Sequence, residues 1–171
     1  WAEAWNELLR AGLIRAYGGS NWALERVEAL NEYARTHGLI GMSCVSNNLS
    51  LARMVNPVGG GCLAASDPES RAWLRRTQLP LLAWSSQARG FFTERARPDD
   101  LSDQELARSW YSEDNFQRKA RAEELAERRG VAPIVIALAY VLCQPFPVFA
   151  LIGPRVLAEM RQSLQVLEVE L

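Results

Sequence analysis

Hydrophobic positions form two kinds of pattern along the chain. Short, mostly apolar runs lie at 13–17, 41–45, 79–84 and 148–152, and a Gly or Ser follows each of them. Runs of this length, bounded by turn residues, predict strands that are buried in a sheet.

Between and after these runs, apolar residues recur every three or four positions, which predicts amphipathic helices. We expect helices at 1–11, 21–37, 113–129, 133–142 and 157–167, and a short one that opens at 67–69. Asn21 and Ser112 are the expected N-caps of two of them, because short polar side chains accept hydrogen bonds from first-turn N–H groups. The helix at 133–142 is apolar on nearly every side and is predicted to be buried, and the stripe from Leu157 to Leu167 is predicted to pack.

A strand followed by a helix, repeated four times, predicts an α/β fold with parallel strands. In such folds the functional groups collect at the carboxyl ends of the strands. The residues at these positions are Ser20–Asn21, Ser46–Asn48, Trp84–Gln87 and Gly153–Arg155. Their shared position is the first indication of a site.

Composition limits the possible functions. The 171 residues, 49% of them hydrophobic, suffice for one globular domain. A net charge of −1 argues against nucleic acid as a partner. The longest apolar run, 131–143, is too short to cross a bilayer. Cys44, Cys62 and Cys143 are widely spaced and odd in number, which suggests reduced thiols and a cytoplasmic setting without a cysteine metal site.

Histidine and lysine are scarce. His37 is the single histidine, and Lys119 is the single lysine. A Ser-His-Asp triad, a histidine metal cluster or a Lys-His proton relay would have to use them. His37 closes a predicted helix and Lys119 lies on a charged one, so neither is expected to be catalytic, and no metal ligands are predicted.

Several segments of the chain together resemble the aldo/keto reductase family. The segments are AGLIRAYGGSNW, PLLAWSSQARGFFT, ELAERRGVAPIVIALAYVLCQP and PVFALIGPRVLAEMRQSLQVLEVEL, which match family landmarks in order and with natural spacing. Members of that family are (β/α)₈ barrels of the TIM type that bind NADPH in extended form and reduce a small-molecule carbonyl to an alcohol. The resemblance implies an oxidoreductase that uses NADPH, with NADH also possible.

The resemblance also implies roles for residues near the first and third strands. Ser20 and Asn21 match the pair that hydrogen-bonds the nicotinamide carboxamide, and a hydroxyl with an amide can fix which ring face meets the substrate. Trp84 lies where the family usually stacks a Tyr on the nicotinamide ring. The segment from Ser85 to Gly90, with Gln87 and Arg89, matches the loop over the pyrophosphate.

At the last strand, Gly153 and Arg155 match the family's adenosine end, where a guanidinium would favour the 2′-phosphate of NADPH. The chain departs from the pattern at several points. Ser163 stands where the family has an adenine-contacting Asn, and Gln87 replaces a Leu. Asn48 is the available amide at the second strand, where the family often has a Gln.

The family's catalytic Asp, Tyr, Lys and His lie on its first four strands. This chain matches only strands five to eight, so we expect residues 1–171 to be one partial domain, the C-terminal half of a barrel. It would carry most of the cofactor site and no catalytic residue, and alone it should be inactive. The other half, or alternatively a second copy of the chain, would complete the barrel.

Other interpretations remain open at this point. The chain could be a non-catalytic half-barrel that serves binding or assembly. A different barrel enzyme, such as a glycosidase, would need two carboxylates at strand ends, and none is there. The glycines at 59–61 lack the pattern of a phosphate-binding loop, and Asp99, Asp100 and Asp103 are predicted to form a solvated loop.

Overall fold

The computed structural model describes residues 1–171, and its centre is one parallel sheet. The strands lie in the order β1-β2-β3-β4, so each strand is hydrogen-bonded to its neighbour in the sequence. They are β1 Gly18–Ser20, β2 Cys44–Ser46, β3 Leu81–Ala83 and β4 Val148–Ala150. The predicted α/β fold with parallel strands is therefore confirmed, and the arrangement is that of a partial TIM-type barrel.

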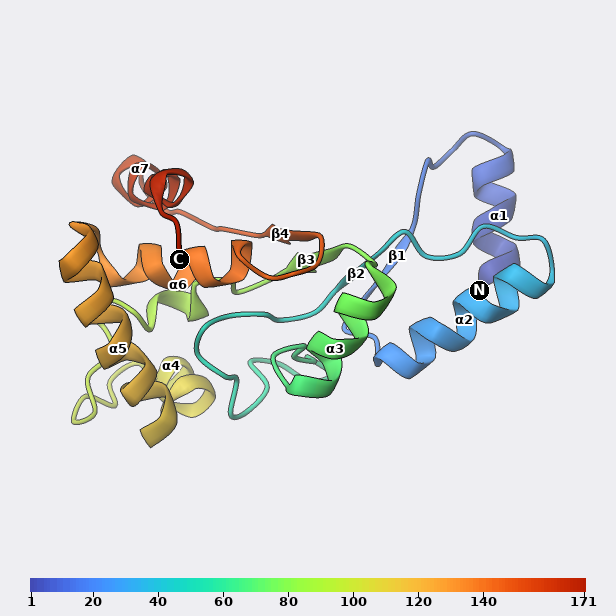
Figure 1. The fold of residues 1–171 in the computed structure, drawn as a ribbon. Helices are drawn as coiled ribbons and strands as arrows, with labels where there is room; N and C mark the ends of the chain where they lie inside the picture. The colour runs from blue at the N-terminus through green and yellow to red at the C-terminus, as the bar shows by residue number, and fades with distance from the viewer.

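Seven α-helices and two 3₁₀ turns connect and flank the strands (Figure 1). The helices are α1 Ala2–Arg10, α2 Leu24–Thr36, α3 Pro68–Thr77, α4 Gln104–Trp110, α5 Glu113–Arg129, α6 Pro133–Leu142 and α7 Leu157–Leu164. The 3₁₀ turns are Ala88–Gly90 and Gln165–Glu168. At least one helix follows each strand, as parallel crossover connections require.

Helices cover only one face of the sheet. Val45 and Leu81 lie in register and are fully buried in a core that includes residues of α2, α3 and α6. The next row of the ladder points to the opposite face, because successive side chains of a strand alternate. In that row Leu82 is half-buried and its partner Phe149 is 58% exposed. The second face therefore lacks the cover that a fully enclosed parallel sheet has.

The first strand is made of glycines because its neighbours leave no room for side chains. A Cβ at Gly18 would lie 2.4 Å from the carbonyl oxygen of Cys44, and one at Gly19 would lie 2.8 Å from the Trp22 ring. The strand expected at 13–17 therefore begins later, at Gly18, where the chain can approach β2 closely. The second strand is also shifted, from the expected 41–45 to Cys44–Ser46.

Several helix boundaries agree with those predicted from the sequence. The side chain of Ser112 accepts a hydrogen bond from the backbone N–H of Asn115, and Gly130 ends α5 in the left-handed conformation. Asp67 caps α3, and Pro68 occupies its first turn. The apolar residues of α6 are buried between two cores, as predicted.

Other helix predictions were wrong. Asn21 does not cap α2; that helix begins after Ala23, without a side-chain cap. Asn21 has a positive φ of 55°, and its Oδ1 accepts a hydrogen bond from the backbone N–H of Leu63. The sequence reading also missed α4, whose cap is Asp103. A seven-residue helix shows too few turns for its period to stand out.

The predicted packing stripe of α7 is also contradicted. Leu157, Met160, Leu164 and Leu167 are all exposed, and Leu167 keeps 77% of its surface. The buried residues of this segment are Ser163 and, in the following turn, Val166, which packs against apolar residues of α6. An apolar stripe on a helix becomes buried only where another element of the structure covers it.

The buried side chain of Asn115 joins the loop after β2 to the α4–α5 corner. Its Oδ1 accepts a hydrogen bond from the N–H of Arg53, and its Nδ2 donates to the carbonyls of Arg53 and Trp110. We predict that Asn115→Ala lowers the free energy of unfolding by at least about 2 kcal/mol, because it leaves several buried backbone groups unpaired. Equilibrium urea unfolding of the chain measures this.

Asn56→Ala is the matched control. Asn56 is exposed and makes one hydrogen bond, to the carbonyl of Arg108, so its loss should cost less than about 1 kcal/mol. Equal effects of the two substitutions would contradict the role given to Asn115.

Candidate functional site

One large cleft lies at the carboxyl ends of β3 and β4. Its volume is about 960 Å³, within the range of small-molecule and cofactor sites. It is bounded by the loop after β3, by the segment after β4, by the start of α6 and by α7. Six of the sequence-predicted residues line it: Ser85, Gln87, Arg89, Gly153, Arg155 and Ser163.

Two side-chain hydrogen bonds connect the walls of this cleft. The hydroxyl of Ser86 donates to the carbonyl of Leu151 at 2.8 Å, which ties the end of β3 to the end of β4. The Nε2 of Gln87 donates to the hydroxyl of Ser163 on α7 at 3.2 Å. Residues more than 60 positions apart in the sequence therefore form one rim.

The loop after β3 lines the cleft and contains backbone donors without a partner in the protein. Ser85, Ala88 and Arg89 have positive φ angles between 47° and 53°, a conformation that costs non-glycine residues energy. The backbone N–H groups of Ser86 and Gln87 donate to no other group of the protein. Free N–H groups in a loop with alternating handedness form anion-binding concavities. Donors of this kind are suited to an anion such as a pyrophosphate.

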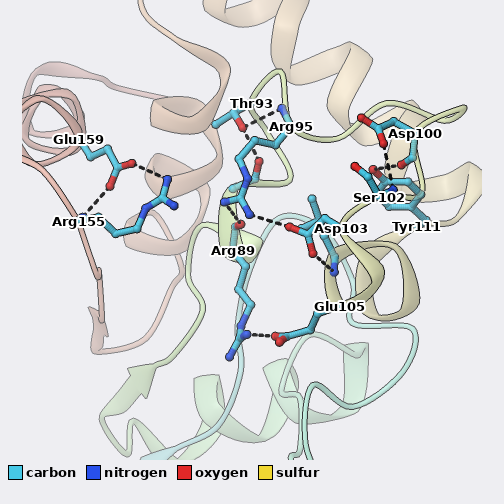
Figure 2. A network of polar contacts seen from close by, with 12 residues as sticks. Arg89, Thr93, Arg95, Asp100, Ser102, Asp103, Glu105, Tyr111, Arg155 and Glu159 are labelled. Atoms are coloured by element: carbon cyan, nitrogen blue, oxygen red, sulfur yellow. Dashed lines mark hydrogen bonds and ion pairs between the residues drawn. The ribbon is translucent and has the colours of Figure 1, made fainter.

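Each arginine at the cleft is held by a carboxylate, as Figure 2 shows. Arg89 pairs with Glu105, and Arg95 pairs with Asp103 at 2.7 Å. Arg155 pairs with Glu159 at 3.0 Å, four residues further along the chain. No arginine side chain at the cleft is therefore free to meet an anion without giving up or sharing a carboxylate.

These contacts also act on the carboxyl groups. The backbone N–H of Leu106 and, less strongly, Arg95 hold the pKa of Asp103 below its usual range. Hydrogen bonds from the backbone and the side chain of Arg155 lower the pKa of Glu159 in the same way. Both groups are therefore carboxylates at neutral pH.

The structure does not bring the other four candidate residues into this cleft. Ser20 lies exposed at the end of β1, next to Asn21. Asn48 is fully buried, and its Nδ2 donates to the carbonyl of Trp84 at 2.9 Å. Trp84 is half-buried, and its indole N–H has no partner. These residues occupy the same edge of the sheet as the cleft, because all four strands are parallel.

The whole chain matches the model of the aldo/keto reductase family, residues 1–171. The chain belongs to the aldo/keto reductase family. It is 24% identical over 177 aligned residues to uncharacterized oxidoreductase YrpG of Bacillus subtilis, covering 100% of this chain and 50% of that protein. It is 30% identical over 172 residues to norsolorinic acid reductase stcV of Emericella nidulans, covering 97% of this chain and 40% of that protein. The chain thus spans about half the length of these curated relatives.

The single histidine of this aldo/keto reductase chain lies away from the cleft. His37 caps the end of α2, and its ring stacks on that of Tyr33 with 3.9 Å between centroids. It does not line the cleft. His37 therefore closes the helix, as predicted from the sequence.

The single lysine lies on a charged helix, α5, as predicted, but its side chain is buried. Lys119 is only 8% exposed, and its ammonium donates to the carbonyls of Thr93 and Ala96 at 2.7 and 2.5 Å. Burial lowers the pKa of this ammonium group, and Glu123 at 3.9 Å partly opposes that effect. Lys119 therefore fixes the loop that forms one wall of the cleft. Sequence reasoning missed it, because a lone lysine on a polar helix face looks solvated.

No group of three or more His, Cys, Asp or Glu residues is placed to hold a metal ion. Asp99, Asp100 and Asp103 lie in and at the end of an exposed or half-exposed loop, as predicted. None of the helices is both long and apolar enough to cross a bilayer.

Asp103 combines two roles that substitution can separate. Its Oδ1 caps α4 by accepting from the N–H of Leu106 at 3.0 Å, and its Oδ2 pairs with Arg95. We predict that Asp103→Ala costs about 1 kcal/mol of stability, while Asp103→Asn costs less, because Asn caps as well as Asp and a surface ion pair contributes little. Thermal and urea unfolding measure both variants.

The pH dependence of this effect has a defined sign. Because the folded-state pKa of Asp103 is lowered, the stabilisation by its charge is complete above its unfolded pKa of about 4 and is lost as pH falls through the lower folded value. The difference in unfolding free energy between wild type and Asp103→Asn should therefore shrink from pH 5 to pH 2. A constant difference over this range would contradict the assignment.

Proposed function

We propose that this chain supplies the cofactor-binding half of an NAD(P)H-dependent reductase that converts a carbonyl group to an alcohol. The observation that carries the proposal is the cleft itself. It joins free backbone donors, polar side chains and arginines from the ends of two parallel strands. Ligands bind at this edge in α/β folds generally, and membership of the family supports the chemistry.

In this proposal the adenosine half of the cofactor occupies the cleft. The N–H groups of Ser86 and Gln87 bind the pyrophosphate, and the Gln87–Ser163 pair lies toward the adenine. Ser20 and Asn21 bind the nicotinamide carboxamide at the end of β1. Three strand intervals of about 4.8 Å separate β1 from β4, so the dinucleotide must lie extended across roughly 14 Å of strand ends. When bound, the cofactor supplies the hydride.

Asn48 and Trp84 hold the end of β3 in position beside the proposed cofactor site. The hydrogen bond from Asn48 to the carbonyl of Trp84 fixes where the chain leaves β3. We propose that Trp84 contributes its aromatic surface beside the nicotinamide. The proton donor comes from residues outside this chain, since His37 and Lys119 are engaged elsewhere.

The uncovered surfaces indicate where the rest of the barrel packs. Phe149 on β4 and the apolar stripe of α7 are exposed, and both edge strands have one unpaired side. Exposed apolar side chains beside unpaired strand edges are typical of an interface. We propose that the preceding half of the barrel covers it, because the relatives are about twice as long as this chain. A second copy of the chain is the alternative.

The activity test compares the full natural protein with residues 1–171 alone. We expect the full protein to oxidise NADH or NADPH in the presence of aldehydes, and residues 1–171 to show at least about a 10²-fold lower rate, because general acid catalysis contributes that much or more. Absorbance at the reduced-nicotinamide band follows the reaction. Clear turnover by residues 1–171 would contradict the division of roles, and cofactor binding without turnover by the full protein would favour the non-catalytic alternative.

Gly153 offers a direct test of the cleft. A Cβ at this position meets no atom within 4 Å, so Gly153→Val should fold normally while its side chain narrows the cleft. We predict at least about a tenfold loss of NAD(P)H affinity by fluorescence titration, because the new side chain excludes part of the ligand.

Gly60→Val is the control, since Gly60 also has open space and lies outside the cleft. It should leave the affinity within about twofold of wild type. If both variants bind NAD(P)H like the wild type, the cofactor does not use this cleft.

A further inference from the structure

We propose that Glu159 makes this cleft selective for NADH over NADPH. The inference rests on the proposed function, that the cleft binds the adenosine half of a nicotinamide dinucleotide. It goes further by naming the side chain that decides between the two cofactors. It also reverses the expectation that Arg155 recognises a 2′-phosphate.

Glu159 holds Arg155 by two contacts at the cleft wall (Figure 2). Its Oε2 accepts a hydrogen bond from the backbone N–H of Arg155 at 2.7 Å, and its Oε1 accepts one from the guanidinium Nη2 at 3.0 Å. The guanidinium therefore already has an anion as its partner. A 2′-phosphate near Arg155 would have to displace this carboxylate or lie beside it, and two anions at such a distance repel.

The rest of the cleft offers no free cation to compensate. The charged residues that line it are Arg89, Arg95 and Arg155, with Glu94, Glu123 and Glu159. Their formal charges cancel. Arg89 and Arg95 are engaged by Glu105 and Asp103. The 2′-phosphate of NADPH, which carries up to two negative charges, would therefore enter a cleft without net positive charge.

The same carboxylate suits the ribose of NADH. Each carboxylate oxygen can accept about two hydrogen bonds, and each oxygen of Glu159 accepts one from Arg155. Acceptor capacity remains on both oxygens for ribose hydroxyl groups. An acidic side chain at the ribose is the general device by which proteins select NAD, whereas an arginine accommodates the phosphate of NADP. Here the acid neutralises the arginine beside it.

Glu159 is ionised across the neutral range. The backbone N–H and then the guanidinium of Arg155 lower the pKa of its carboxyl group. The other charged groups of the cleft face the same space, but only Arg155 forms an ion pair with Glu159. The preference for NADH over NADPH should therefore persist from about pH 6 to pH 9.

The experiment measures dissociation constants of NADH and NADPH for the full natural protein by fluorescence titration and calorimetry. We expect wild type to bind NADH at least about tenfold more tightly than NADPH. Glu159→Gln keeps the shape and can still accept hydrogen bonds from Arg155, but it removes the charge. It should shift the ratio of the two constants toward NADPH by about tenfold or more, mainly by tightening NADPH.

Glu168→Gln is the matched control, because it removes the same charge from the same segment at a position outside the cleft. For this variant the ratio of the NADH and NADPH dissociation constants should stay within about twofold of the wild-type ratio. A wild-type preference for NADPH, or an unchanged ratio in Glu159→Gln, overturns the role of Glu159 while cofactor binding stands. Failure of wild type to bind either cofactor overturns the proposed function itself.

Discussion

The pairing of β3 with β4 is the constraint on which the site depends. Three residues of each strand lie in parallel register, from Leu81 opposite Val148 to Ala83 opposite Ala150. More than 60 residues, including α4, α5 and α6, lie between these strands. Parallel pairing requires such a crossover, and it places both carboxyl ends at one edge. The loop after β3 meets the segment after β4 only for this reason.

Burial of α6 keeps this pairing in place. The helix contacts the core under the sheet on one side and the core formed with α4 and α5 on the other. Its beginning also forms part of the cleft wall. Packing, strand register and the shape of the cleft are therefore linked. Apolar contacts set the positions of the two strand ends, and the hydrogen bonds from Ser86 and Gln87 add to this arrangement. The wall on the other side depends on Lys119, whose buried ammonium holds the loop at residues 93–96.

The sequence predicted the order of elements and the sheet edge at which the cleft lies, because runs and stripes of apolar residues carry this information directly. It placed Ser85, Gln87, Arg89, Gly153, Arg155 and Ser163 as candidates, and all six line one cleft. It could not predict which cations are already paired, since Arg89–Glu105 and Arg95–Asp103 depend on how loops fold back. The exposed stripe of α7 was misjudged for a related reason, because a sequence shows an apolar face but not what covers it.

The proposed function requires the edge formed by the two loops to bind a dinucleotide. Hydrogen–deuterium exchange of the full natural protein, with and without saturating NADH, tests it most directly. We predict slower exchange at residues 84–90 and 153–163 on binding, because the free N–H groups of Ser86 and Gln87 gain acceptors. No change at these segments, in a protein that demonstrably binds the cofactor, would contradict the account.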